Sequence, residues 1–89
     1  MPTCKRVIYT GQVQGVGFRY TTRRLAANFA VTGYVRNQPD GSVEVVAEGD
    51  QGEVDRFLEA LGQRMAGYIA DRTLHDEPAC GYPGFTIRT

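Results

Sequence analysis

Apolar and polar side chains alternate along residues 5–10, which is the pattern of a β-strand. Val7 and Tyr9 fall on one face of this segment, and mainly polar side chains fall on the other. After Gly11 the spacing becomes that of a helix, because apolar or small residues recur on one helical face. These positions are Phe18, Thr22, Leu25, Ala26 and Phe29. The pattern therefore predicts a strand, a glycine-rich loop and a helix in succession.

A similar succession follows in the rest of the chain. Residues 33–38 and 42–48 alternate as two strands, joined by a turn that the tripeptide Pro39-Asp40-Gly41 favours. In the second strand, one face is apolar and carries Val43, Val45 and Ala47. We expect the opposite face to be mostly exposed to water.

A second helix is predicted to begin at Asp50, which has the spacing of a capping box with Glu53. The helix is expected to stop near Gly62 or Gly67. Its apolar positions have helical spacing and are Val54, Phe57, Leu58 and Leu61.

Two further strand candidates are a weaker one at residues 68–77 and a short one at residues 85–88. The resulting order, βαββαβ with a short last strand, predicts a single α+β domain over residues 1–89. We expect a ferredoxin-like antiparallel sheet with both helices on one face. This fold alone indicates no function, because nucleic-acid binders, ligand-binding domains and enzymes all use it.

Charge is unevenly distributed along a chain whose formal net charge is zero. Residues 1–39 contain six basic side chains and no acidic one, whereas residues 40–89 contain four arginines and all ten acidic side chains. Either the first half forms an anion-binding site, or the two halves pair with each other in the fold. The sequence favours neither alternative.

Several classes of chemistry lack the residues that they need. The chain has one serine, Ser42, and one histidine, His75, which disfavours a Ser-His-Asp triad. His75, Cys4 and Cys80 do not have the spacing of a metal site, so we expect neither a metal nor another cofactor. The two cysteines are expected to be reduced rather than bridged.

The first residues contain no apolar signal core, and the chain has no run near the roughly 20 apolar residues of a membrane helix. We therefore expect a cytoplasmic protein with no membrane partner.

The loop between the first strand and the first helix has the composition of an anion cradle. Gly15 and Gly17 allow the successive amides from Gln14 to Arg19 to turn toward one point, with the positive end of the helix dipole behind them. The guanidinium of Arg19 can add a bidentate contact to a phosphate or carboxylate. The alternative is a tight turn whose arginine is merely solvated.

A second segment makes the pattern more specific. Residues 11–19, GQVQGVGFR, and residues 33–37, GYVRN, followed by the turn at 39–41, Val43 and Gly49, resemble the acylphosphatase family. The family consists of small ferredoxin-like enzymes that hydrolyse the carboxyl-phosphate bond of acyl phosphates without a metal. The resemblance implies that the backbone of residues 14–18 and the side chain of Arg19 bind the phosphoryl group, while Asn37 holds the attacking water. The backbone positions concerned are Gln14, Gly15, Val16, Gly17 and Phe18.

The substrate implied is a small-molecule acyl phosphate, with acetyl, carbamoyl and glyceroyl phosphate as candidates. Inorganic phosphate or sulfate is expected to compete for the same site, and the protein is expected to be a monomer. The place of Tyr20, beneath the loop or on its rim, stays open. Arg23 and Arg24 are expected to be solvated on the helix surface.

Other functions remain as alternatives. One is a phosphate-binding or acyl-phosphate-binding module without catalysis, or a domain like the one that opens larger carbamoyl-transfer proteins. Another is a nucleic-acid-binding domain, but Val43 and Val45 stand where stacking aromatic side chains are wanted, so no nucleic-acid partner is expected.

The resemblance also places Ala30 where a glycine commonly ends the first helix. If Ala30 has a left-handed backbone, its replacement by glycine is expected to be neutral or stabilising.

Overall fold

A computed structural model describes residues 2–89, which form two helices and five strands. The elements are β1 (Thr3–Gly11), α1 (Phe18–Ala26), β2 (Val31–Asn37), β3 (Val43–Gly49), α2 (Gln51–Arg64), β4 (Ile69–Glu77) and β5 (Phe85–Arg88). Their order confirms the ferredoxin-like α+β prediction, with each predicted boundary within a few residues. Met1, the first residue of the predicted domain, lies outside the described residues.

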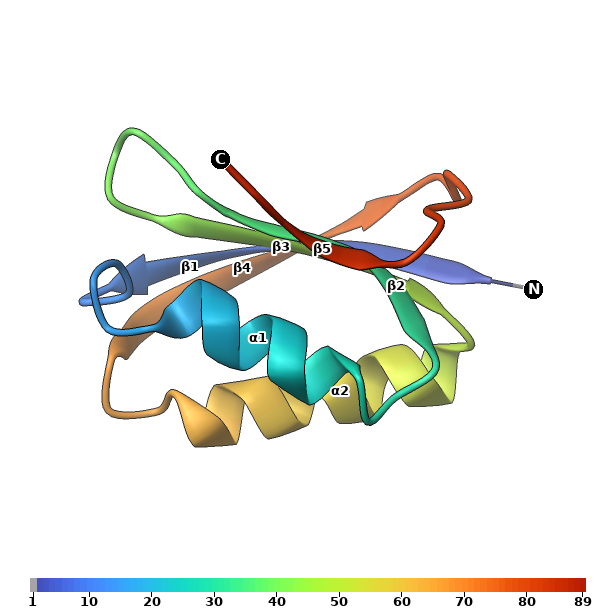
Figure 1. The fold of residues 1–89 in the computed structure, drawn as a ribbon, viewed down its shortest axis with the longest axis horizontal. Helices are drawn as coiled ribbons and strands as arrows, with labels where there is room; N and C mark the ends of the chain where they lie inside the picture. Colours follow the sequence, from blue (N-terminus) through green and yellow to red (C-terminus); the bar gives the residue numbers. More distant parts are fainter. Residues whose placement is uncertain (1) are drawn as a thin grey trace.

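The strands form one sheet in the order β4-β1-β3-β2-β5, with α1 and α2 against the same face (Figure 1). The first four strands pair antiparallel as expected, whereas the short β5 runs parallel to β2, so the sheet is mixed. Pairing of Cys4 with both Glu48 and Glu77 places the start of β1 beside the ends of β3 and β4. Strand β2 also starts at this end of the sheet, opposite Gly49. Because the chain leaves β4 there and enters β5 there, β5 takes the direction of β2.

The core lies between the sheet and the helices. Val7 and Tyr9 of β1 are fully buried in it, as the alternation predicts. The α2 stripe is confirmed as buried: Val54, Phe57, Leu58 and Leu61. Helix α1 ends at Ala26, one turn before the predicted pattern does, but the ring of Phe29 still lies 6.0 Å from that of Phe57.

The opposite face of β3 is buried, so the expectation that it is mostly wet is wrong. Glu44 is 3% exposed and Glu48 is 7% exposed. The Tyr34 hydroxyl and Arg36 Nε donate to Glu44 Oε1 at 2.9 and 2.7 Å, and Arg6 Nη1 lies 3.5 Å from Glu44 Oε2. Buried carboxylates need such donors, because an unpaired charge away from water is costly.

The connection between β4 and β5 covers the rest of this face. The amides of Cys80 and Gly81 donate to Glu48 Oε1 at 3.0 and 3.1 Å, and Tyr82 packs edge-on against Tyr34 at 5.8 Å. A crossing segment therefore excludes water where the alternation alone indicated exposure. Cys4 beneath it is buried, Cys80 is exposed, and both thiols are free.

The two halves of the fold are also joined between the helices. Asp50 precedes α2 as predicted, but its side chain makes no capping hydrogen bond. Glu53 Oε1 instead accepts the amide of Ala30 at 2.8 Å. Since no residue other than glycine has a positive φ between residues 2 and 89, Ala30 is not left-handed, and the condition on which the prediction for its replacement by glycine depends is not met. None of the helices in this range is long and apolar enough to cross a membrane.

We predict that Gly33→Ala lowers the free energy of unfolding by at least about 2 kcal/mol. Gly33 has a φ of +141°, and a Cβ there would overlap the carbonyl oxygen of Val46 on the neighbouring strand. Urea denaturation measures the change.

The matched control is Gly62→Ala, which adds the same methyl group inside α2 where no atom lies within 4 Å. It should raise the free energy of unfolding by about 0.5–1 kcal/mol, because alanine is the better helix former. An equal loss in both variants would contradict the steric explanation.

Candidate active site

The loop before α1 and the end of β2 enclose one hollow of about 250 Å³. Its lining residues are Val13, Gly15, Gly17, Phe18, Arg19, Tyr20, Asn37 and Ile87. The fold thus brings Arg19 and Asn37, which come from separate elements, to the same place. Of the other residues singled out in the sequence, Gln14 and Val16 lie in the same loop but do not line the hollow.

Two left-handed glycines shape the backbone of the loop. Gly15 and Gly17 have φ angles of +79° and +78°, and neither has an atom within 4 Å of where a Cβ would stand. Glycine is therefore required for conformation and not for space. The first helical amide that donates within the helix is that of Thr21, to the carbonyl of Gly17, which leaves the three amides before it without helical partners. Such a helix start attracts anions.

The first turn of α1 is anchored from below. Phe18 is 2% exposed, and its ring lies 5.2 Å from that of Tyr9 in β1. Thr22 Oγ1 donates to the carbonyl of Phe18 at 2.7 Å. Burial raises the pKa of Tyr9, so this phenol stays neutral at physiological pH. The residue before Arg19 is thereby held in the core.

The side chain of Gln14 ties the loop to the hairpin between β2 and β3. Its Nε2 donates to the carbonyls of Gln38 and Ser42 at 2.8 and 2.9 Å. The hairpin is itself held by Asp40, whose carboxylate accepts the amide and hydroxyl of Ser42 at 3.0 and 2.6 Å. These hydrogen bonds lower the pKa of Asp40. Sequence reasoning missed this role of Gln14, because its partners are main-chain carbonyls, and every residue has one whatever its side chain.

Asn37 is the last residue of β2, immediately before this hairpin. Its Oδ1 is buried and has no hydrogen-bond partner within residues 2–89. A buried acceptor of this kind is uncommon in folded proteins and calls for a partner from outside the chain.

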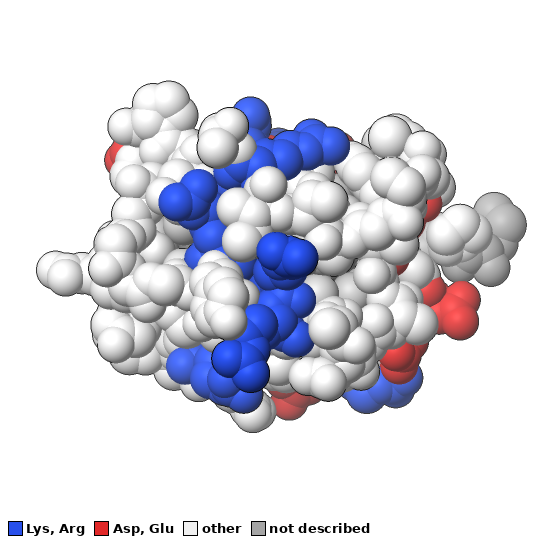
Figure 2. All heavy atoms as spheres, in the orientation of Figure 1, with Lys and Arg blue, Asp and Glu red and all other residues white. Residues whose placement is uncertain are grey.

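Charge pairing separates the basic residues of the first half into two groups. Lys5, Arg6 and Arg36 form ion pairs with acidic residues of the second half, at distances of 2.7 to 3.5 Å. Arg19 and the other two arginines of α1, at 23 and 24, form none in the part of the chain that the structure describes. Figure 2 shows basic side chains as a band across α1. The first half of the chain therefore combines both alternatives: some of its basic residues pair with the acidic half, and the arginines of α1 stay available to an anion.

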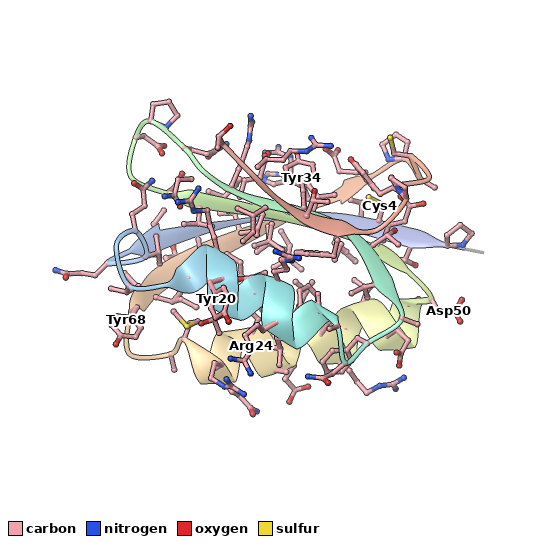
Figure 3. All side chains as sticks on the ribbon, viewed as in Figure 1. Cys4, Tyr20, Arg24, Tyr34, Asp50 and Tyr68 are labelled. Carbon is pink, nitrogen blue, oxygen red and sulfur yellow. The ribbon has the colours of Figure 1, made fainter. Side chains whose placement is uncertain are left out.

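The side chain of Tyr20 is 59% exposed and lines the hollow, so it lies on the rim and not beneath the loop. Figure 3 shows it projecting from α1 away from the sheet. Between residues 2 and 89, no three His, Cys, Asp or Glu side chains are grouped so that they could hold a metal ion.

The chain is similar to proteins of one family. The family model Acylphosphatase matches residues 5–87. An acylphosphatase of Methanospirillum hungatei is 46% identical over 88 residues, which cover 94% of this chain and 97% of that protein. The crystal structure of acylphosphatase from Bacillus subtilis superposes with a TM-score of 0.87 at 32% identity, covering 100% of both chains. The structure of T. kodakarensis HypF superposes with a TM-score of 0.81 at 26% identity, covering 100% of this chain and 12% of that one.

We predict that Gln14→Met weakens the affinity for inorganic phosphate about tenfold, because two main-chain carbonyls each lose one of their two donors and the loop is released from the hairpin. Isothermal titration calorimetry measures the affinity. Gln12→Met is the control, since Gln12 lies in the same loop and its side chain forms no hydrogen bond in the described residues. Equal affinities in the two variants would show that the tie does not shape the site.

Proposed function

Because this chain belongs to the acylphosphatase family, we propose that the hollow at the start of α1 is where it hydrolyses acyl phosphates. This chain is an enzyme of this family, and the enzymes of the family act on small-molecule acyl phosphates. The observation that carries the proposal is that Asn37, whose buried Oδ1 has no hydrogen-bond partner, lines the same hollow as Arg19, which forms no ion pair within residues 2–89.

In this proposal the phosphoryl group is bound by Arg19 and by the amides of residues 14–18. Phosphoryl transfer has a loose transition state with negative charge on the equatorial oxygens, so positioned donors supply most of the catalysis. Support comes from the two left-handed glycines and from the free amides at the start of α1. The guanidinium adds full charge to the partial charges of the amides.

Asn37 orients the attacking water. Its Oδ1 accepts a hydrogen bond from the water, which can then approach phosphorus in line with the leaving oxygen. A neutral amide performs this task without repelling the phosphoryl dianion, as a carboxylate would. The tie from Gln14 to the hairpin supports the role, because it connects the loop that binds the phosphoryl group with the segment next to Asn37.

The leaving group needs no proton. A carboxylate with a conjugate acid of pKa about 4 departs as an anion at neutral pH. The residues that line the hollow include no carboxyl, thiol or imidazole group. The products are the carboxylate and inorganic phosphate, and inorganic phosphate or sulfate should compete with the substrate for the same donors.

We further propose a monomeric protein in the cytoplasm that acts without a metal. The two free thiols support a reducing compartment. Binding without catalysis is not favoured, since the chain retains both Arg19 and Asn37. Binding of nucleic acid is also not favoured: the ring of Tyr34 is 9% exposed and is covered by Arg88, whose Cζ lies 3.9 Å from the ring centroid.

We predict that Arg19→Gln lowers kcat/KM for benzoyl phosphate about a thousandfold, because both ground-state and transition-state contacts are lost. Asn37→Ala should lower kcat about a hundredfold and change KM less than about threefold, since the phosphoryl donors remain. Ultraviolet absorbance follows the reaction, with excess chelator present throughout.

Arg23→Gln is the control for the loss of one positive charge from α1, and it should retain most of the activity. Wild-type rates in either site variant would remove that residue from the mechanism. Loss of the wild-type rate on chelation would contradict a reaction without a metal.

A second prediction concerns pH. Since no side chain with a pKa near neutrality lines the hollow, kcat should vary less than about twofold between pH 6 and 8. Initial rates across this range, each corrected for spontaneous hydrolysis, measure the profile. A sigmoidal or bell-shaped profile in this range would point to an acid or base that the proposal does not contain.

A further inference from the structure

A second hollow lies beside the first and shares the side chain of Tyr20 with it. It measures about 340 Å³ and opens between α1 and the end of α2. Its lining residues are Tyr20, Thr21, Arg24, Leu25, Asn28 and Arg64. All but one of these side chains are polar, and none is acidic.

Two arginines from different helices line this hollow. Arg24 belongs to α1 and Arg64 to the last turn of α2, and neither forms an ion pair with any residue from 2 to 89. Helix α1 contains no acidic residue that could neutralise them. Like charges that share one hollow repel each other, and an anion between them removes this repulsion.

The position of Arg24 relates this hollow to the phosphoryl site. Tyr20 and Arg24 lie one helical turn apart and project from α1 away from the sheet (Figure 3). The Cζ of Arg24 lies 5.6 Å from the centroid of the Tyr20 ring, so the guanidinium lies back toward the start of the helix. Along the axis, Arg24 is about 9 Å beyond the first residue of α1. An acyl group of the size of a para-substituted benzoyl group, held at the phosphoryl site, spans a distance of this order.

We propose that this second hollow binds an anionic group on the acyl part of the substrate, a carboxylate or a phosphate, through Arg24 and Arg64. The inference rests on the proposed function, because the phosphoryl group in the first hollow determines where the acyl part lies. The phosphoryl donors act alike on every acyl phosphate. Arg24 and Arg64 select among acyl groups and favour those that carry a second negative charge.

The test compares two substrates of nearly equal size and shape, 4-carboxybenzoyl phosphate and 4-carbamoylbenzoyl phosphate. The charged group and the amide both stand across the ring from the acyl phosphate. The wild-type enzyme should have a kcat/KM about fivefold higher for the carboxylate, as expected for a partly exposed charged pair. A third substrate, 4-phosphonobenzoyl phosphate, tests phosphate-like charge: a preference for it alone assigns the hollow to phosphate groups.

Arg24→Gln and Arg64→Gln should each reduce the ratio of kcat/KM between the charged and the amide substrate, and the double variant should bring it to about one. Arg23→Gln is the matched control, because Arg23 is an exposed neighbour on α1 that lines neither hollow. It should leave the ratio unchanged.

Three results would overturn the proposal: no preference for either charged substrate in the wild type, an unchanged ratio in both hollow variants, or an equal drop in Arg23→Gln. An equal drop in Arg23→Gln would assign the effect to the summed positive charge of the α1 arginines and not to the second hollow. Failure of the phosphoryl site would look different, since Arg19→Gln would then hydrolyse all three substrates at the wild-type rate.

Discussion

The left-handed backbone at Gly17 is the constraint on which the site depends. It ends the loop and begins α1 in a single residue, and Phe18 directly after it enters the core. The tilted contact between Phe18 and Tyr9 then fixes the first turn of the helix against β1. Arg19 follows directly, and its direction is determined by a packed ring and not by a flexible loop. A cradle built from main-chain groups needs such support, because amides have no side-chain freedom with which to correct their aim.

Buried carboxylates hold together the parts that the core does not reach. Glu44 accepts donors from Tyr34 and Arg36, and Glu48 accepts two amides of the connection to β5. The ion pairs between the basic first half and the acidic second half therefore lie mainly on the face of the sheet opposite the helices. The arginines of α1 have no such partners in the described residues, so unpaired positive charge is concentrated beside the hollow at the start of α1.

Local patterns were sufficient for those elements whose burial follows from their own periodicity. The α2 stripe and the Val7 and Tyr9 face of β1 are examples. Local patterns were insufficient where a segment distant in the sequence determines the burial of a side chain or the direction of a strand. The local alternation predicts that Glu44 is exposed, but Arg6, Arg36 and Tyr34 surround its carboxylate in the fold. The direction of β5 depends on where β4 ends. The glycine loop, Arg19 and Asn37 could be located from the motif, and the structure brings them to one hollow. The tie from Gln14 to two carbonyls more than 20 residues away has no counterpart in any local pattern.

The interior position of β1 in the sheet, with a neighbour on each edge, affects how the protein folds. Its neighbours are β3 and β4, and Cys4 pairs with Glu48 on one side and with Glu77 on the other. Both neighbours lie later in the chain, so β1 is synthesised before either of the strands with which it pairs. Hydrogen bonds on both edges of β1 form only after β4 has been synthesised, so folding of this domain requires loop closure over long sequence separations.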